Sequence, residues 1–470
     1  MLKEPIFVLI ILSALLNGED WPQFRGANAS GVSASKGLPV EFGPEKNMVW
    51  RTALPPGQSS PAVAGDHIFL TAVEDNRLFT LSLERATGRI QWRREVPRPN
   101  RAKMHKLNGP AAPSPVTDGK NVYAFFNDFG LISFGPDGEE RWRLPLGPFN
   151  TPFGLASSPV LADGTLLQVC DGETGAFIVA VDTVTGKVKW RKERPDATRG
   201  SSTPLVYGPA GGPTELLVAG AYRLTSYSVE TGDEIWFARG LTWQLIPTPV
   251  LGKGVIYVLG WAGGADPGEQ QELPPFADML QRLDANHDGK LSKDELHDPK
   301  LIKNWNDLDL DRSGYVEERD WESYLARMSA QNGFNAFRLG GKGDVTSRNF
   351  LWRFNKALPV VASPLLYRDV LYLVKDGGIL TSLDPRNGVV LKQARIEGAM
   401  EAYYASPVAA DGKIYTASEN GKVSVVKAGG EWEVLKVNDL GEECYSTPAI
   451  VDNRIYLRTQ SALYCFAIKD

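Results

Sequence analysis

A Ser/Thr-Pro dipeptide that leads into an apolar strand recurs eight times along the chain, and this repeat constrains the fold more than any other feature. The copies begin at Ser60, Ser114, Ser158, Thr203, Thr248, Ser363, Ser406 and Thr447. The copies from Ser158 to Thr248 are 45 residues apart, a period typical of repeats built from four short strands. The interval from Thr248 to Ser363 is 115 residues. It equals one period if about 70 residues are inserted there.

An alternating apolar strand follows each dipeptide, and a second strand then leads to a tight turn and often to a Trp. The fullest copy runs from Ile178 to Trp190, with its turn at Thr185-Gly186. Gly, Asp and Asn supply the positive φ angles that such turns require. Similar endings occur at Thr87-Gly88 with Trp92, Asp137-Gly138 with Trp142, and Thr231-Gly232 with Trp236. Four antiparallel strands in each period predict a β-propeller with eight blades.

The two ends of the repeat decide between a closed ring and an extended solenoid of strands. The eighth copy, from Tyr445 to Ile468, stops before a Trp-bearing outer strand, whereas the segment from Met48 to Leu54 offers one with Trp50. We expect this N-terminal strand to complete the last blade, which leaves no free edge. The predicted fold class is all-β: an eight-bladed propeller closed by the N-terminal strand, with a small α-helical insertion in blade 5.

With this pattern the chain resembles the quinoprotein dehydrogenase-like propellers, the PQQ repeat family that also includes the outer-membrane assembly propeller lipoprotein. The resemblance covers Trp21 to Ile468 apart from the insertion. It is carried by the Ser/Thr-Pro starts, by the turn and Trp pattern, and by the opening Trp21-Pro22-Gln23-Phe24-Arg25-Gly26. It implies the propeller fold, but it is weak for function because one fold hosts many activities.

The insertion contains two loops that match the calcium-binding loop of an EF-hand. In the first, positions 1, 3, 5, 6, 9 and 12 are Asp284, Asn286, Asp288, Gly289, Ser292 and Glu295, and the carbonyl of Lys290 stands at position 7. In the second loop, the same six positions are Asp309, Asp311, Ser313, Gly314, Glu317 and Asp320, and the carbonyl of Tyr315 stands at position 7. We predict two Ca²⁺ sites. The second is expected to be weaker because Asp320 is shorter than the bidentate Glu usual at position 12.

Apolar residues at helical spacing flank both loops and predict a small helical module. The stripes are Phe276, Leu280 and Leu283; Ile302 and Trp305; and Trp321, Leu325 and Met328. Leu291 and Val316 stand at position 8, where paired loops join through a short strand contact. Only the segment from Leu296 to Leu308 separates the loops, and Pro299 interrupts it. A compact structural module is therefore favoured over a sensor that opens a groove.

Strand polarity places the module on one face of the predicted ring. In blade 5, Val255 to Trp261 is the second strand, and the outer strands resume at Phe337 to Leu339 and at Phe350 to Phe354. The module therefore interrupts the connection between the second and third strands. This connection shares a face with the segments that precede each Ser/Thr-Pro, which we call the funnel face. The module is expected to form a cover or a side wall for the funnel.

Aromatic and polar residues precede the dipeptides on the funnel face. They are Gln58, Asn108, Phe153, Arg199, Trp243, Gln244, Glu401, Tyr403, Tyr404, Glu443 and Tyr445. A funnel of this composition suits a ligand or a peptide. The candidate ligand- or partner-binding residues are Arg199, Trp243, Gln244, Glu401, Tyr403 and Tyr445. The alternative interpretation is that these residues only line a wet channel.

A basic run lies on the same face, in the connection between the first two blades. It consists of Arg94, Arg98, Arg101, Lys103, His105 and Lys106. Such a run either attracts an acidic partner or forms a solvated loop.

The residues favour a binding scaffold over an enzyme. The PQQ-dependent dehydrogenases that the chain resembles have adjacent cysteines and a calcium-binding set of carboxylates and an amide, and neither is found here. The histidines form no nucleophile or zinc pattern; they are His67, His105, His287 and His297. We expect a calcium-binding scaffold with a protein, peptide or glycan partner at the funnel face. The alternative is a PQQ-dependent alcohol or sugar dehydrogenase, although no residue supports PQQ binding and no catalytic residue is assigned.

The N-terminus predicts export to the periplasm or the medium. The apolar run from Ile6 to Leu16 follows Lys3 and has the length of a signal peptide. An uncleaved anchor is the alternative, and only then is a membrane involved. The net charge of -5, from 51 basic and 56 acidic residues, argues against a nucleic-acid partner. The expected division is a signal peptide at 1–18, propeller at 19–264, the EF-hand pair at 265–335, and propeller at 336–470.

The three cysteines are too few for a disulfide framework. Either Cys444 and Cys465 are bridged, or these two and Cys170 are small buried hydrophobes in strands.

Overall fold

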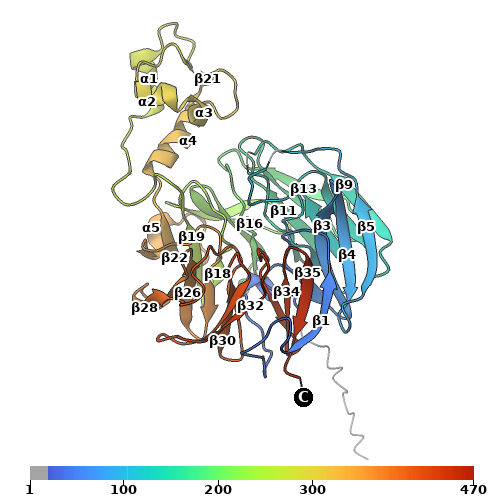
Figure 1. Ribbon diagram of the computed structural model, residues 1–470. Helices are drawn as coiled ribbons and strands as arrows, with labels where there is room; N and C mark the ends of the chain where they lie inside the picture. Colours follow the sequence, from blue (N-terminus) through green and yellow to red (C-terminus); the bar gives the residue numbers. More distant parts are fainter. Residues whose placement is uncertain (1–19, 103, 152, 470) are drawn as a thin grey trace, which may run out of the picture.

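Eight antiparallel sheets surround one axis in the computed structural model, which describes residues 20–102, 104–151 and 153–469 (Figure 1). Each sheet has four strands, which follow in sequence order except in the last sheet, where the N-terminal strand forms the outer edge, and the sheet of blade 4 carries one more strand at its outer edge. The predicted eight-bladed propeller is therefore confirmed. The predicted signal peptide at 1–18 lies outside the described residues. No helix in the described ranges is both long enough and apolar enough to cross a bilayer.

The strands of the first four blades follow the chain from the axis outward. Blade 1 has β2 (Ala62–Ala64), β3 (His67–Glu74), β4 (Arg77–Glu84) and β5 (Ile90–Val96). Blade 2 has β6 (Val116–Thr117), β7 (Val122–Phe126), β8 (Gly130–Phe134) and β9 (Glu140–Pro145). Blade 3 has β10 (Val160–Ala162), β11 (Thr165–Cys170), β12 (Phe177–Asp182) and β13 (Val188–Glu193). Blade 4 has β14 (Leu205–Tyr207), β15 (Glu215–Gly220), β16 (Arg223–Ser228) and β17 (Glu234–Arg239).

The last four blades contain the insertion and the closure of the ring. Blade 5 has β18 (Val250–Leu251), β19 (Val255–Gly260), β22 (Gly333–Arg338) and β24 (Phe350–Phe354). Blade 6 has β25 (Leu365–Tyr367), β26 (Val370–Lys375), β27 (Ile379–Leu383) and β28 (Val390–Arg395). Blade 7 has β29 (Val408–Ala410), β30 (Lys413–Ala417), β31 (Lys422–Lys427) and β32 (Glu433–Asp439). Blade 8 has β33 (Ala449–Val451), β34 (Arg454–Arg458), β35 (Ala462–Phe466) and β1 (Met48–Ala53).

The Ser and Thr residues of the repeat lie around the axis, and a hydrogen bond between two of them joins neighbouring blades at seven of the eight junctions; we call these eight residues the hydroxyl belt. The N–H of Ser60 donates to Ser114 Oγ at 2.9 Å, and the N–H of Ser114 donates to Ser158 Oγ at 2.9 Å. The same bond links Ser158 to Thr203, Thr248 to Ser363, Ser363 to Ser406, Ser406 to Thr447, and Thr447 to Ser60. Because the last bond returns to blade 1, the belt runs across the seam of the ring.

The turn and Trp pattern joins neighbouring blades a second time, at their outer strands. Trp142 of β9 donates its indole N–H to the carbonyl of Thr183 at 3.0 Å, in the turn between β12 and β13 of the next blade. A Cβ atom placed on Gly186 in that turn would lie 2.6 Å from the Trp142 ring. The glycine is therefore needed both for its positive φ of 71° and for the close approach of the ring.

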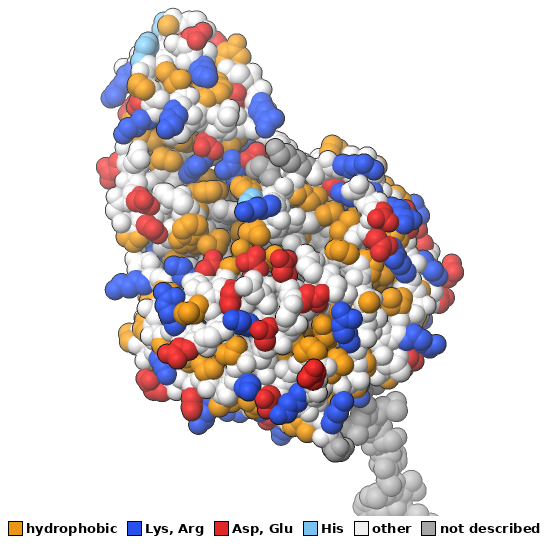
Figure 2. Space-filling model, in the orientation of Figure 1, with side chains coloured by type: hydrophobic (Ala, Val, Ile, Leu, Met, Phe, Trp, Pro, Cys, Tyr) orange, Lys and Arg blue, Asp and Glu red, His pale blue; other side chains and the backbone are white. Residues whose placement is uncertain are grey.

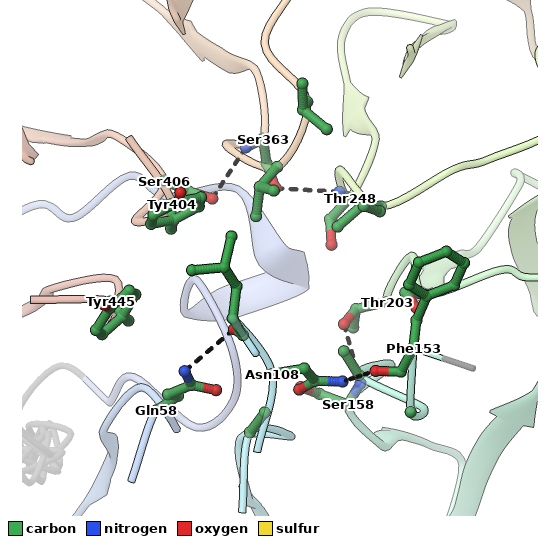
Figure 3. Close-up of a pocket in the computed structure, with 18 of the residues that line it drawn as sticks. Gln58, Asn108, Phe153, Ser158, Thr203, Thr248, Ser363, Tyr404, Ser406 and Tyr445 are labelled. Carbon is green, nitrogen blue, oxygen red and sulfur yellow. Dashed lines mark hydrogen bonds between the residues drawn. The ribbon is translucent and has the colours of Figure 1, made fainter. Parts of the chain in front are cut away.

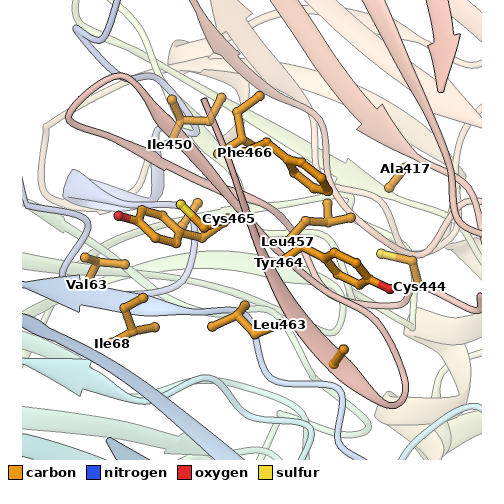
Figure 4. Close-up of a cluster of buried hydrophobic side chains, with 14 of the residues drawn as sticks. Val63, Ile68, Ala417, Cys444, Ile450, Leu457, Leu463, Tyr464, Cys465 and Phe466 are labelled. Atoms are coloured by element: carbon orange, nitrogen blue, oxygen red, sulfur yellow. The ribbon is translucent and has the colours of Figure 1, made fainter. Parts of the chain in front are cut away.

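The N-terminal strand completes blade 8, as predicted. Strand β1 pairs antiparallel with β35, with Trp50 opposite Cys465. The core around this seam joins side chains of blades 7, 8 and 1, including Ile68, Leu457 and Phe466 (Figure 4). All three cysteines are unbridged and buried, so the alternative of a bridge between Cys444 and Cys465 is wrong for this structure.

The segment before β1 closes the channel at the face opposite the funnel, which the repeat does not predict. Trp21 pairs with Val63 of blade 1, and Gly31 accepts a hydrogen bond from the N–H of Ala409 of blade 7. Arg25 is fully buried and donates to the carbonyl of Pro364 at 2.6 Å. Burial lowers its pKa to about 9. The segment also contains the short helix η1 (Ala27–Ala29), and its ribbon crosses behind the cavity in Figure 3.

The insertion stands between β19 and β22 of blade 5 and projects from the ring in Figure 1. Its elements are α1 (Phe276–Leu283), β20 (Leu291–Ser292), α2 (Pro299–Lys303), α3 (Trp305–Leu308), β21 (Tyr315–Val316) and α4 (Glu318–Ser329). A second excursion before β24 holds β23 (Gly343–Asp344) and α5 (Thr346–Asn349). Strand β23 pairs parallel with β17 and so ties blade 5 to blade 4.

Substitution of Gly186 tests the contact with Trp142. We expect Gly186→Ala to lower the free energy of unfolding by about 2–4 kcal/mol, because overpacking adds about 1–3 kcal/mol to the backbone cost of about 1 kcal/mol. Gly164→Ala is the matched control, since Gly164 has a φ of 68° and open space around its Cβ position. Urea unfolding of both variants measures the difference. Equal losses would show that the ring contact is not what requires a glycine.

Candidate functional site

The insertion has its own small core, built from the apolar stripes on its helices. Trp321 and Leu308 are buried at its centre, and the Trp321 indole N–H donates to the carbonyl of Pro274 at 2.8 Å. Strands β20 and β21 pair antiparallel, with Leu291 opposite Val316. The predicted contact between the two loops at position 8 is confirmed. These elements hold the loops side by side, and we call residues 273–329 the EF-hand module.

The first loop is folded around the carboxylates of its first and last positions. Asp284 accepts hydrogen bonds from the N–H groups of Asp288 at 3.2 Å and Gly289 at 3.0 Å. Glu295 reaches back across the loop and accepts from the N–H of Ala285 at 3.0 Å. It also accepts from the N–H of Ser292, which is the largest cause of its lowered pKa. The loop thus brings position 12 beside positions 1 and 2, which is the arrangement that an EF-hand ion needs.

The second loop begins in the same way but ends differently. Asp309 accepts from the N–H groups of Ser313 at 2.9 Å and Gly314 at 3.0 Å. Asp320 accepts from the N–H of Glu317 at 3.1 Å and so caps helix α4, as Glu295 accepts from Ser292, but among the described residues it makes no bond to the start of its loop. Burial raises the pKa of Asp320, and the carboxylates of the neighbouring ligand positions Asp311 and Asp309 raise it further. The short side chain at position 12 therefore serves the helix in this structure.

The two loops differ from a preformed acidic metal cluster. Within the described ranges, no three His, Cys, Asp or Glu side chains lie close enough together to hold a metal ion. Glu317 pairs with Lys290 across the two loops instead. An EF-hand also draws on amide, hydroxyl and carbonyl oxygens, here from Asn286, Ser292 and Lys290. The donor set therefore fits Ca²⁺, and the twelve ligand positions remain predictions.

The module is attached to the funnel face through a group of charges around Trp243. Asp307 of α3 accepts from Arg199 at 3.4 Å and from Arg327 of α4 at 2.6 Å. The guanidinium carbons of Arg199 and Arg327 lie 5.6 and 5.0 Å from the centre of the Trp243 ring. Arg199 also donates to Glu173 at 2.6 Å. We call Arg199, Trp243, Asp307 and Arg327 the docking cluster.

The docking cluster is close to both the second loop and the funnel. Asp307 is two residues before Asp309, the first ligand position of that loop. Arg199 lines the funnel cavity. Helix α4 makes a second attachment, because Arg319 donates to the carbonyl of Pro195 at 2.7 Å. No described residue of the module lines the cavity, so the module is attached beside the cavity, through Arg199 and Pro195, and does not cover it.

A cavity of about 500 Å³ occupies the axis on the funnel face. All eight residues of the hydroxyl belt line this cavity, and Figure 3 shows several of them around the axis. Phe24 of the N-terminal segment also belongs to the lining. Eight of the predicted funnel residues line the cavity in the structure: Gln58, Asn108, Phe153, Arg199, Gln244, Tyr403, Tyr404 and Tyr445. Trp243 belongs to the docking cluster instead, and Glu401 pairs with Lys422 at 3.0 Å. Whether any of these residues binds a ligand stays a prediction.

Two tyrosines form one side of the cavity. Tyr404 and Tyr445 stack with their ring centres 5.6 Å apart and their planes at 26°, and Figure 3 shows them across the cavity from Phe153. The Tyr445 hydroxyl lies 3.1 Å from Glu419 Oε1 and 3.2 Å from Glu443 Oε2. Glu419 was not among the predicted residues. It lies in the turn between β30 and β31, and such turns share the funnel face by strand polarity, so polarity could have found it.

The basic run is partly neutralised within the protein. Arg98 pairs with Asp128 at 2.8 Å, and Asp128 also accepts from the N–H of Ala102. Arg94 donates to the carbonyl of Gly138 at 2.7 Å. His105 lines the cavity. Lys103 lies outside the described residues.

Comparison with known proteins agrees with this architecture. The family model described as outer membrane protein assembly factor BamB matches residues 43–152, 130–264 and 341–470, which together make up more than half of the chain. A model described as EF hand matches residues 276–298, which include the first loop. No curated protein matches the chain in sequence.

Three solved structures illustrate the similarity in fold. BamB from Moraxella catarrhalis has a TM-score of 0.57 and 12% identity, over 90% of this chain and 97% of that one. The computationally designed Ika8 protein has a TM-score of 0.54 and 11% identity, over 90% of this chain and 100% of that one. The quinohemoprotein alcohol dehydrogenase ADHIIG from Pseudomonas putida has a TM-score of 0.46 and 13% identity, over 88% of this chain and 76% of that one. At 12% and 11% identity, the similarity to BamB and to Ika8 shows the fold alone.

The docking cluster can be tested with a neutral substitution at its centre. Asp307→Asn leaves two guanidinium groups without their shared carboxylate, and we expect a loss of about 1–2 kcal/mol in the attachment of the module. Hydrogen exchange of peptides from α3 and α4 should then become roughly five- to thirtyfold faster, because exchange follows the opening equilibrium. Glu322→Gln, on the exposed side of α4, is the control. Unchanged exchange in Asp307→Asn would mean that the cluster does not hold the module.

Proposed function

The chain belongs to the family described as outer membrane protein assembly factor BamB, and we propose that it is an exported, calcium-binding β-propeller that acts as a binding scaffold through its funnel face. The observation that carries the proposal is the cavity of about 500 Å³ on the face where the EF-hand module is attached. A cavity of this size, lined by aromatic rings and a few polar groups, is typical of binding sites. The partner class is a protein, a peptide or a glycan.

The family name supports a protein partner and a location outside the cytoplasm. An assembly factor of the outer membrane works on the far side of the inner membrane, and the sequence before Asp20 has the pattern of a signal peptide. We infer periplasmic or secreted localisation, with the segment 1–18 removed and the remaining chain divided at 264 and 335 as expected from the repeat.

The EF-hand module would hold Ca²⁺ at its two loops. In the first loop the side chains of Asp284, Asn286, Asp288, Ser292 and Glu295 and the carbonyl of Lys290 supply oxygens. A bound ion supplies positive charge that lets these carboxylates approach one another. In the second loop, the shorter side chain of Asp320 makes no bond to the start of the loop among the described residues, whereas Glu295 in the first loop bonds to the N–H of Ala285. We therefore propose a tighter first site and a weaker second one.

The cavity lining does not fit PQQ, the cofactor of the dehydrogenases with related repeats. PQQ is a planar polycarboxylate and needs cationic groups around it. Of the lining residues that the structure describes, only Arg199 and His105 can be cationic, and Arg199 already pairs with Glu173 and Asp307. Asp376 lines the same cavity and would repel a carboxylate. These groups favour the scaffold over the dehydrogenase.

Calcium titration tests the loops one at a time. Isothermal titration of the whole chain should give two sites, of which Asp284→Ala removes the tighter and Asp309→Ala the weaker. Asp278→Asn, an exposed carboxylate in the first turn of α1, should keep both. Asp320→Glu should tighten the second site, because Glu at this position still caps α4 and reaches further. An unchanged stoichiometry in both alanine variants would show that the loops do not bind calcium.

A dye-reduction assay separates the scaffold from the dehydrogenase. We expect no reduction of an electron-accepting dye when the protein is incubated with PQQ, Ca²⁺ and a panel of alcohols and aldoses. A spectrum of the mixture after gel filtration checks whether PQQ stays bound. Reduction that depends on the protein and on one of the substrates would contradict the scaffold proposal.

A further inference from the structure

The funnel cavity is chemically different on its two sides. The side formed by blades 3 and 4 carries charges that are paired within the protein: Asp171 is bonded to Arg194 at 2.8 and 3.0 Å, and Arg199 is bonded to Glu173 and Asp307. The side formed by blades 6 to 8 carries the stacked pair Tyr404 and Tyr445. We call this second side the tyrosine wall; it comprises Asp376, Tyr404 and Tyr445 of the cavity lining, together with Glu419 and Glu443, which lie behind the lining and contact the Tyr445 hydroxyl.

The carboxylates of the tyrosine wall lack cations of their own. Asp376 lies in the turn between β26 and β27, Glu419 in the turn between β30 and β31, and Glu443 just before Tyr445. None of the three forms an ion pair with a Lys, Arg or His of the described residues. Glu401, nearby on the same face, does pair with Lys422. In Figure 2, acidic side chains gather on the near side of the propeller, below the EF-hand module.

Among the described residues, the hydrogen bonds within the tyrosine wall leave carboxylate oxygens without a donor. The Tyr445 hydroxyl has one proton but lies within hydrogen-bond distance of both Glu419 and Glu443, so it can serve only one of them at a time. A ligand that fits this side must therefore bring hydrogen-bond donors and positive charge. Lys and Arg side chains carry donors only.

The tyrosine rings add a second attraction for the same kind of group. An ammonium or guanidinium group over the face of a Tyr gains about 0.5–2 kcal/mol, with the larger value when water is excluded. Burial raises the pKa of Tyr404, and the charges of Glu419 and Asp376 raise it further. Burial likewise raises the pKa of Tyr445. Both phenols therefore stay neutral at physiological pH, and their rings remain available to a cation.

We propose that the tyrosine wall binds a Lys or Arg side chain of an extended segment in a partner polypeptide. The cavity, at about 500 Å³, is much larger than one ammonium group and can also take the neighbouring residues of the segment. Its remaining lining offers Gln58, Asn108 and Gln244, whose amides can bond to a peptide backbone, and Phe153 for an apolar side chain. This inference rests on the proposed scaffold function and specifies the chemistry of the partner.

Fluorescence anisotropy with labelled peptides tests the inference on the whole chain. The probe is a capped Gly-Ser peptide with two central lysines, and its counterpart has acetyl-lysine at both positions. We expect the lysine peptide to bind at least tenfold more tightly than the acetylated one, and its affinity to fall as salt increases. Equal binding of the two peptides, or no binding of the lysine peptide, would overturn the proposal.

Two variants assign the binding to the wall. Glu419→Gln removes one charge and Tyr404→Leu removes one ring, and each should weaken the lysine peptide at least fivefold. Glu230→Gln changes the charge equally on an exposed turn of the opposite face and should not alter binding. Full binding by Glu419→Gln and Tyr404→Leu would overturn the proposed location. Thermal unfolding and calcium stoichiometry show whether each variant is folded.

A competition experiment distinguishes a polypeptide from a free amine. Butylamine and methylguanidinium should displace the labelled peptide only at concentrations far above that of the unlabelled peptide. Displacement at equal concentration would show a small-amine site and overturn the polypeptide partner. The calcium titration and the dye-reduction assay do not involve the tyrosine wall, so a failure of the scaffold proposal can be told apart from a failure of this inference.

Discussion

The structure depends on a hydrogen bond at the axis in which the backbone N–H of one blade donates to a hydroxyl of the next. All eight side chains of the hydroxyl belt are buried. A buried N–H without an acceptor costs about 1–3 kcal/mol, so each blade needs a neighbour that supplies a short hydroxyl side chain. The following Pro has no N–H and leaves no second donor to satisfy. The belt thereby fixes the spacing of the blades, the width of the channel, and the face on which every segment that precedes it must lie.

The elements that follow from a local period could be predicted, and those held by distant contacts could not. The blade count, the pairing of β1 with β35, and the place of the module follow from spacing and strand polarity alone. The segment from Trp21 to Gly31 contacts blades 1 and 7 through backbone hydrogen bonds and blade 6 through the Arg25 side chain, and these contacts follow no period, so nothing in its sequence indicates that it closes the channel. Trp243 was placed in the funnel because it precedes a dipeptide, but its ring instead lies beside Arg327, which comes from the insertion.

The functional chemistry was predictable to a similar degree. The EF-hand loops have fixed spacing, so Asp284 to Glu295 could be read position by position, including the short Asp320 at the end of the second loop. The tyrosine wall has no such spacing, because Asp376 and Glu419 come from turns whose lengths differ between blades. Its character depends on which charges are paired, and pairing is a property of the folded protein. The guanidinium of Arg199 is bonded to Glu173, whereas the carboxylate of Glu419 contacts the Tyr445 phenol and forms no ion pair among the described residues.

The N-terminal segment also determines the order in which the molecule can be completed. Met48 pairs with Phe466, and Gly31 accepts from the N–H of Ala409, so the first and last parts of the chain must both be present before the axis is sealed. Contacts over such sequence distances form slowly, since the loop-closure entropy is lost before the contacts compensate for it. Until then the chain is an open arc whose terminal blades expose unpaired strand edges. The lifetime of that arc, rather than the stability of any single blade, therefore governs how much of the chain escapes aggregation and proteolysis.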